Sequence, residues 1–274
     1  MIKFNKKSDS NEIKDFYESE GYVVFSGLLN DFEINGLVEE INSLLTSLSD
    51  AEVKFFGMVT KSGEQIEIKQ RDFLMLPEED KLAMISGNWR IHEFHKQSRF
   101  CKGITLNSEI IRIVRSISND SMEPGYSINF RNGSNQMLHQ DDVVFHIAPL
   151  GNLVGAWIAL EDIVKSSGPL VFYPKSHKEP LFDGFAGYPT INLRTCDDET
   201  FNKYQPYVDD LAEKYDRKVF LANKGDVLFW HGGLIHGGSK VEDTSRTRRS
   251  LVIHYCPPKL DIFDQIKLPV RWGK

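Results

Sequence analysis

The segment Leu138-His139-Gln140-Asp141 contains two side chains that could bind a metal ion. In a β-strand, alternate residues point to the same face, so His139 and Asp141 would lie side by side. One further imidazole would complete a facial triad of two histidines and one carboxylate, which holds iron(II) and leaves three coordination positions open. Such positions suit a bidentate 2-oxo acid together with O2. The tripeptide alone is a weak signal, because a surface His near a surface Asp gives the same pattern.

A glycine-rich segment further along the chain could supply the third ligand. An apolar run ends at Trp230 and is followed by His231-Gly-Gly-Leu-Ile-His236-Gly-Gly. Its glycines would let the backbone pass close to a metal. From the residues alone, both His236 and His231 are candidates for this ligand.

An arginine-rich segment lies twelve residues beyond His236 and could bind an organic acid. Arg248 and Ser250 alternate onto one face of the apolar strand expected after them. A guanidinium pairs with a carboxylate through two hydrogen bonds, and a hydroxyl group can add another. These two side chains could therefore hold the distal carboxylate of 2-oxoglutarate. Arg246 and Arg249 are expected on a solvated edge.

The elements that must position these residues begin with helices. Apolar residues recur at helical spacing in several stretches of the first 120 residues. The expected elements here are a helix capped by Asn11 and ending near Gly21, a strand at 22–25, a helix from about 31 to 45, a hairpin turning at Ser62-Gly63, and helices at 78–85 and 107–116.

Short β-rich runs replace helices from about residue 126 onward. The expected strands are 127–130, 137–146, 154–160, 170–173, 219–221, 227–230 and 250–255. Helices followed by short strands indicate an antiparallel sandwich or barrel buttressed by helices. Residues 183–215 interrupt the pattern with a polar stretch that contains aromatic residues, which we expect to be an insertion over one end of the barrel.

Composition excludes several other classes of protein. The net charge of −6 offers no basic surface for nucleic acid or anionic lipid, and no apolar run approaches the roughly 20 residues that span a bilayer. Three scattered cysteines without CxxC spacing argue against a disulfide framework, and the first residues lack the apolar core of a secretory signal. Without repeats or linkers, residues 1–274 are expected to form one cytoplasmic domain with no obligate protein partner.

The ordered motifs resemble those of the phytanoyl-CoA dioxygenase family. They keep the family's order from about residue 126 to residue 255, and the opening Phe16-Tyr-Glu-Ser-Glu-Gly-Tyr-Val-Val is similar more loosely. The matching blocks are Leu-His139-Gln-Asp141, Gly155-Ala-Trp-Ile-Ala-Leu-Glu161, Ser167-Gly-Pro-Leu-Val-Phe-Tyr-Pro-Lys-Ser-His-Lys178, Lys224-Gly-Asp-Val-Leu-Phe-Trp-His231 with Leu-Ile-His236-Gly, and Arg248-Arg-Ser-Leu-Val-Ile-His-Tyr255.

This resemblance implies a double-stranded β-helix (a jelly-roll, cupin-like fold), mainly β with flanking helices. It implies that iron(II) is held by His139, Asp141 and His236, and that Arg248 binds the C5 carboxylate of the cosubstrate 2-oxoglutarate. The expected reaction hydroxylates an unactivated C–H bond of a small-molecule substrate with O2 and releases succinate and CO2. Related halogenases have Gly or Ala in place of Asp141, so we expect hydroxylation and not chlorination.

Further residues take expected roles from the same resemblance. Trp157 matches a tryptophan that lines the cosubstrate pocket, although it could equally be a core aromatic residue. Ser127 matches a pocket-wall residue, and Arg90 could match a basic residue that helps to bind the cosubstrate. His254 falls at no ligand position and is expected to make structural hydrogen bonds.

Two other classes of function are compatible with a metal-binding jelly-roll. One is an isomerase or hydrolase that uses zinc or manganese without O2 and needs no distal arginine. The other is a binding protein that keeps the fold but has no activity. The substrate is expected to contact residues 55–100 and 183–215, and the lack of a dense Lys/Arg cluster disfavours a CoA thioester.

Overall fold

The strands form two antiparallel sheets in the computed structural model, which describes residues 1–118, 121–145, 151–182 and 197–258. The larger sheet has the spatial order β1–β9–β6–β11–β5–β4–β2–β3, and the smaller has the order β10–β7–β8. The strands are β1 (Tyr22–Phe25), β2 (Lys54–Val59), β3 (Gln65–Lys69), β4 (Arg90–His92), β5 (Glu123–Phe130), β6 (Val154–Ala159), β7 (Leu170–Phe172), β8 (Lys218–Val219), β9 (Val227–His231), β10 (His236–Gly238) and β11 (Ser250–Cys256).

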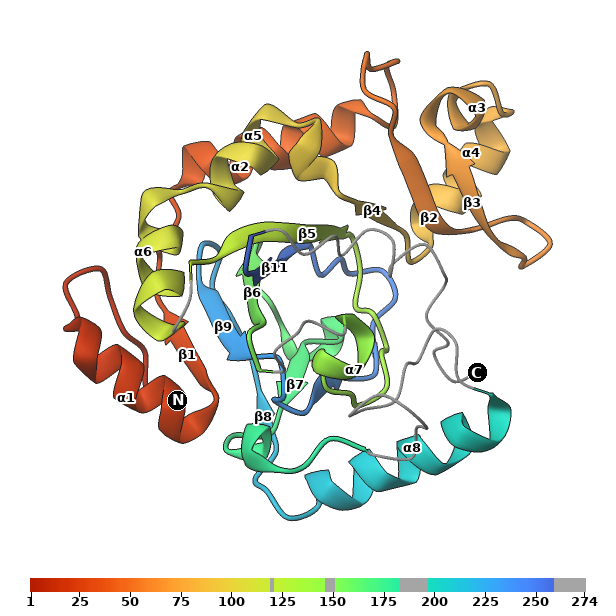
Figure 1. Cartoon of the computed structure of the whole chain (residues 1–274). Coiled ribbons are helices and arrows are strands. Elements are labelled where there is room, and N and C mark those ends of the chain that lie inside the picture. Colours follow the sequence, from red (N-terminus) through yellow and green to blue (C-terminus); the bar gives the residue numbers. More distant parts are fainter. Residues whose placement is uncertain (119–120, 146–150, 183–196, 259–274) are drawn as a thin grey trace.

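Helices flank these sheets on several sides. Helices α1, α2, α5 and α6 lie outside the larger sheet, and α8 lies on the opposite side of the molecule from α2 and α5 (Figure 1). This arrangement confirms the expected class, mainly β with flanking helices. The helices are α1 (Ser10–Glu20), α2 (Asp31–Ser43), α3 (Gln70–Leu74), α4 (Glu78–Ser86), α5 (Arg99–Thr105), α6 (Ser108–Ile117), α7 (Asp142–Phe145) and α8 (Asp198–Ala212), with 3-10 turns η1 (Phe94–Lys96), η2 (Lys165–Ser167) and η3 (Ser176–Lys178).

The first helix begins earlier than expected. The carboxylate of Asp9 accepts hydrogen bonds from the backbone N–H groups of Asn11 and Glu12 at 2.9 and 3.1 Å. Asp9, and not Asn11, is therefore the N-cap residue, and it satisfies amides that a helix leaves without internal partners. Gly21 ends the helix in the left-handed conformation at φ +79°.

Strand β11 lies in the middle of the larger sheet, and both of its faces are buried. Leu251 and Ile253 belong to the apolar cluster that joins the sheet to helices α1, α2, α5 and α6. Val252 points the other way, into a second cluster that contains Trp157 and Phe172 from β6 and β7. We name this second side of the sheet the inner face. The residues that share the side of Val252 on β11 are therefore the ones that can meet the smaller sheet.

The expected strand at 137–146 is wrong for most of its length. His139 makes an isolated antiparallel bridge with His236, but residues 142–145 form the helical turn α7. The backbone N–H groups of Val144 and Phe145 both donate to the carbonyl of Asp141 at 2.9 Å. Local β-branched residues favour a strand here, and the turn that follows Asp141 overrides that preference. Residue 146 lies outside the described part of the chain.

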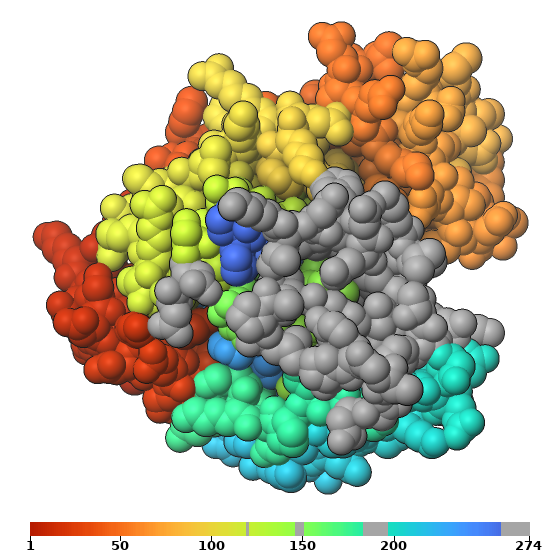
Figure 2. Space-filling model, viewed as in Figure 1, coloured from red at the N-terminus to blue at the C-terminus, as the bar shows by residue number. Residues whose placement is uncertain are grey.

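The other expected strands are confirmed, with end points that differ by a few residues. The hairpin with its turn at Ser62-Gly63 joins β2 to β3, and Gly63 adopts φ +84°, which favours glycine. This hairpin projects from one corner of the molecule together with α3 and α4 (Figure 2). Helix α8 occupies the described end of the expected insertion, and residues 183–196 lie outside the description. No helix among the described residues is long and apolar enough to span a bilayer.

Candidate metal centre

Three side chains with metal-binding atoms meet where the segment after β5 approaches β10. His139 and His236 exchange two backbone hydrogen bonds of 2.9 and 3.0 Å, which places their ring centroids 4.3 Å apart. Asp141 follows two residues later, and its Oδ1 lies 3.6 Å from Nε2 of His139 and 3.7 Å from Nε2 of His236. One donor atom from each residue lies within 4.8 Å of the others, and all three residues are buried.

The hydrogen bonds of the two imidazoles fix their tautomers. Nδ1 of His139 lies 2.8 Å from the carbonyl of Met137, and Nδ1 of His236 lies 2.9 Å from the carbonyl of Leu234. A carbonyl oxygen only accepts, so each Nδ1 carries the hydrogen. The lone pair of each Nε2 then points toward Asp141. Such backbone contacts orient histidine ligands in metal proteins.

The carboxylate of Asp141 stays ionised although it is buried. Burial raises the pKa of this group, but the neighbouring imidazoles, His236 first and then His254, hold it well below the usual value. Two imidazole nitrogens and one carboxylate oxygen on three corners of a site form the donor set of non-haem iron(II) enzymes. The residues present therefore fit the metal that the motif implies.

The second oxygen of Asp141 is held by two residues that sequence reasoning missed. Nε1 of Trp230 donates a hydrogen bond to Oδ2 at 2.8 Å, and Nε2 of His254 lies 3.3 Å from the same atom. His254 therefore contacts the centre directly, where we expected only a structural role. The alternation of β11 carried a signal for this, because His254 lies an even number of residues from Arg248 and so shares its face.

His231, the alternative to His236, lies away from the triad. Its Nδ1 accepts a hydrogen bond from the backbone N–H of Gly233 at 3.0 Å. Its ring faces His177 and Tyr17, with centroids 5.3 and 6.3 Å away. The structure thus brings His236, and not His231, to His139 and Asp141.

Arg248 is a buried cation with few partners. It is 2% exposed, and its guanidinium carbon lies 5.6 Å from the ring centroids of both Phe130 and Trp157. Its Nη2 donates a hydrogen bond to the carbonyl of Asn132 at 3.4 Å, and its Nε has no hydrogen-bond partner among the described residues. Burial lowers the pKa of Arg248 only to about 10, so the group remains charged at neutral pH. This environment suits an incoming carboxylate.

Trp157 and Ser250 lie on the same face as this guanidinium. In the sheet register Trp157 is opposite Val252, and Ser250 is opposite Ala159, so all four point to the inner face. Within the described part of the chain, Nε1 of Trp157 and Oγ of Ser250 have no hydrogen-bond partner, although both are buried. Both can therefore donate to an added ligand.

Ser127 is not brought to this face. It is opposite Ile253 in the register, on the side that packs against the helices, and its Oγ lies 2.7 Å from Nδ1 of His95. We therefore leave Ser127 out of the cosubstrate site. Arg90 is opposite Phe130 and points to the inner face, where burial lowers its pKa. Its role in binding the cosubstrate stays a prediction.

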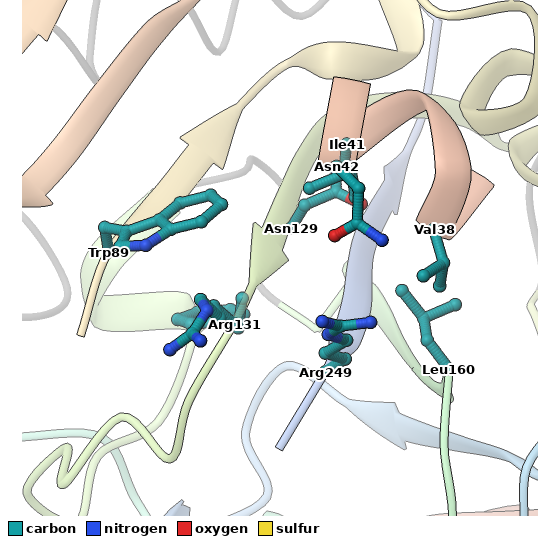
Figure 3. A pocket seen from close by; sticks show the side chains of 9 residues that line it. Val38, Ile41, Asn42, Trp89, Asn129, Arg131, Leu160 and Arg249 are labelled. Atoms are coloured by element: carbon teal, nitrogen blue, oxygen red, sulfur yellow. The ribbon is translucent and has the colours of Figure 1, made fainter. Parts of the chain in front are cut away.

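A separate cavity lies on the outer face of the larger sheet (Figure 3). Its volume, including its open mouth, is about 360 Å³. It contains neither the triad nor Arg248, so we place no reaction there. The lining residues are Val38, Ile41, Asn42, Trp89, Asn129, Phe130, Arg131, Leu160 and Arg249.

Solved structures with the same fold are known. The non-heme alpha ketoglutarate dependent epimerase SnoN from nogalamycin biosynthesis aligns with a TM-score of 0.64 at 16% identity, over 96% of this chain and 93% of that chain. EctD from S. alaskensis, solved with 2-oxoglutarate and 5-hydroxyectoine, aligns with a TM-score of 0.63 at 17% identity, over 91% and 76% of the two chains. These similarities confirm the expected jelly-roll fold.

Sequence comparison finds relatives along most of the chain. The peroxisomal phytanoyl-CoA dioxygenase of Bos taurus is 25% identical over 267 residues, which cover 93% of this chain and 71% of the relative. The phytanoyl-CoA dioxygenase domain-containing protein 1 of Danio rerio is 24% identical and covers 84% of each chain.

The family model described as "Phytanoyl-CoA dioxygenase (PhyH)" matches residues 17–250. That range contains the triad and Arg248. The match confirms the expected enzyme class, a 2-oxoglutarate-dependent non-haem iron dioxygenase. The chain belongs to the phytanoyl-CoA dioxygenase family.

Proposed function

We propose that this protein is an iron(II)- and 2-oxoglutarate-dependent dioxygenase that hydroxylates an unactivated C–H bond of a small-molecule metabolite, releasing succinate and CO2. The observation that carries the proposal is the combination of a buried two-histidine, one-carboxylate triad with a buried guanidinium that forms no ion pair with any described residue. A triad alone would fit many metal enzymes. The added cation fits a cosubstrate that carries a distal carboxylate.

The three metal-binding side chains would act as fixed ligands. His139 and His236 would bind through Nε2, because their Nδ1 atoms are already engaged by backbone carbonyls. Asp141 would bind as the carboxylate, the form that its low pKa maintains at neutral pH. When bound, iron(II) and 2-oxoglutarate supply the oxidising chemistry, in which O2 is consumed. The protein contributes position and the exclusion of water.

Arg248 would anchor the C5 carboxylate of 2-oxoglutarate. The rings of Phe130 and Trp157 flank the guanidinium and keep it from bulk water, which strengthens its attraction for an anion. Ser250 Oγ and Trp157 Nε1 would donate further hydrogen bonds. We include Arg90 as a second basic residue near this site, because it shares the face of Phe130.

The substrate is proposed at the level of its class. Relatives in the family include phytanoyl-CoA dioxygenases, and structural neighbours include an epimerase and a carbocyclase that depend on alpha ketoglutarate. We choose hydroxylation over chlorination because position 141 is a metal-binding aspartate and not the Gly or Ala of related halogenases; desaturation, epoxidation and ring formation branch from the same oxidant, and product analysis distinguishes them. We also propose that residues 1–274 act as one catalytic domain and that the protein works in the cytoplasm.

Anaerobic addition of iron(II) and 2-oxoglutarate tests the proposal without knowledge of the substrate. A visible charge-transfer band should develop, and Asp141→Ala or His139→Ala should abolish it. A zinc or manganese hydrolase, or a binding protein without activity, predicts no band. A screen for succinate release over a metabolite library, read against the uncoupled background, should then identify the substrate. Absence of the band in the folded wild-type protein would refute the proposal.

A further inference from the structure

We propose that Trp230 and His254 are positioning residues that reserve one oxygen of Asp141 for the metal, and that Gly155 makes their arrangement possible. The inference rests on the proposed function, because it concerns how the metal ligand is presented. It assigns roles to three residues outside the triad and outside the cosubstrate site.

The three residues form one row across neighbouring strands. Gly155 of β6 is opposite Trp230 of β9 on one side and opposite His254 of β11 on the other. Directly opposed residues point to the same face of a sheet. The two rings therefore stand on either side of a residue that has no side chain. Their centroids are 6.1 Å apart and their planes are perpendicular.

Gly155 is needed for space and not for backbone conformation. It is not among the glycines with positive φ, so other residues could adopt its backbone. A Cβ atom placed on it would overlap the indole ring of Trp230, against Cε2, Cζ2 and Cδ2. The indole thus lies across the place where a side chain would be. From that position its Nε1 reaches Asp141.

The two rings act on the same carboxylate oxygen. Nε1 of Trp230 lies 2.8 Å from Oδ2 of Asp141, and Nε2 of His254 lies 3.3 Å from it. Oδ1 is the atom that lies 3.6 and 3.7 Å from the Nε2 atoms of His139 and His236. The two carboxylate oxygens therefore have different surroundings: Oδ2 accepts a hydrogen bond from Trp230 and contacts His254, and Oδ1 faces the metal-binding nitrogens.

This division has a consequence for coordination. A carboxylate can bind a metal through one or both oxygens, but Oδ2 would have to give up its hydrogen bond from Trp230 and its contact with His254 to become a ligand. Asp141 would then supply a single donor oxygen, which would leave room on the ion for 2-oxoglutarate and O2. A carboxylate free to rotate could take a second position and compete with 2-oxoglutarate or O2.

Three variants test whether Trp230 and His254 position Asp141, with metal affinity as the readout. Trp230→Phe and His254→Phe each remove one N–H donor, and Gly155→Ala displaces the indole without removing a polar group. Each should weaken binding of Co(II) or Mn(II) about ten- to a hundredfold, the range found when partners of metal ligands are lost. The metal is titrated into the purified protein under anaerobic conditions. Trp89→Phe is the matched control, because Nε1 of Trp89 donates to the carbonyl of Ile85 and the residue lines the separate cavity, which lacks the triad.

A second readout separates positioning from folding. His254→Gln keeps an N–H donor and should recover much of the metal affinity that His254→Phe loses, at similar thermal stability. In the presence of substrate, the phenylalanine variants should release more succinate per hydroxylated product than the wild type. The proposed positioning role is refuted if Trp230→Phe and His254→Phe bind metal as tightly as Trp89→Phe does. If the wild type itself binds no metal, it is the proposed function that fails.

Discussion

Replacing Arg248 by Met should remove 2-oxoglutarate binding without unfolding the protein. Truncation of one partner of a buried charge pair costs about 2–5 kcal/mol of binding free energy. At tenfold per 1.4 kcal/mol, this weakens binding about thirtyfold to a few thousandfold. The guanidinium is 2% exposed and makes one hydrogen bond of 3.4 Å to a described residue. An apolar side chain of similar volume is often neutral or stabilising at such a site.

The assay is an anaerobic titration of 2-oxoglutarate into the iron(II) protein, followed by the charge-transfer band, with thermal denaturation in parallel. Arg248→Lys keeps the charge but loses the planar fork between Phe130 and Trp157, so its affinity should be intermediate. Two results would refute the reasoning. Arg248→Met could bind 2-oxoglutarate as tightly as the wild type, or it could denature at a much lower temperature.

Two further predictions concern buried side chains outside the metal centre, namely Ser127 on β5 and the thiols of Cys101 on α5 and Cys256 on β11. Ser127→Ala should leave 2-oxoglutarate binding unchanged but lower the free energy of unfolding by about 1–3 kcal/mol, because Nδ1 of His95 loses its partner. Denaturant titration measures the change in stability. Loss of 2-oxoglutarate binding in this variant would show that Ser127 belongs to the cosubstrate site. Burial raises the pKa of Cys101 to about 12 and that of Cys256 to about 11, so both thiols stay protonated near neutral pH. Neither should react with iodoacetamide in the folded protein, as mass spectrometry can check, and rapid labelling of either thiol would contradict this account.

His139 and Asp141 could be identified from sequence because their spacing is local, whereas the choice of His236 over His231 came from the family resemblance. His139 and Asp141 are two residues apart, and a glycine-rich bend surrounds His236. The reason for their convergence is not local. It depends on the backbone bridge between His139 and His236, which joins segments far apart in the chain. The alternation argument assumed a strand through Asp141, whereas the chain turns into α7 directly after it.

Ser127 was assigned to the cosubstrate pocket by resemblance, and strand periodicity could not have corrected that assignment. Tyr126, Ser127, Asn129 and Phe130 are all buried, because β5 has helices on one side and the inner face on the other. A strand buried on both faces has no polar face to set its orientation. The sequence therefore predicted that β5 exists but not which of its residues point inward.

Trp230 and His254 were missed for different reasons. The alternation of side chains along β11 places His254 on the same face as Arg248, so its position could have been inferred from sequence. Trp230 could not, since its contact with Asp141 requires the register of β9 against β6 and the space left by Gly155. A glycine in a strand has several meanings, among them a bulge or a close approach. Only the packing distinguishes between them.

The unpaired polar atoms around Arg248 favour a ligand site over a purely structural role. Arg248 Nε, Trp157 Nε1 and Ser250 Oγ are buried on one face without a partner among the described residues. Each such atom costs about 1–3 kcal/mol, a large share of the about 5–15 kcal/mol that keeps a domain folded. All three can donate a hydrogen bond, and a carboxylate only accepts. A structural cluster would mix donors with acceptors and satisfy them internally. A group of donors around one cation is instead complementary to an anion. Binding that anion would offset the free-energy cost of burying these donors without partners.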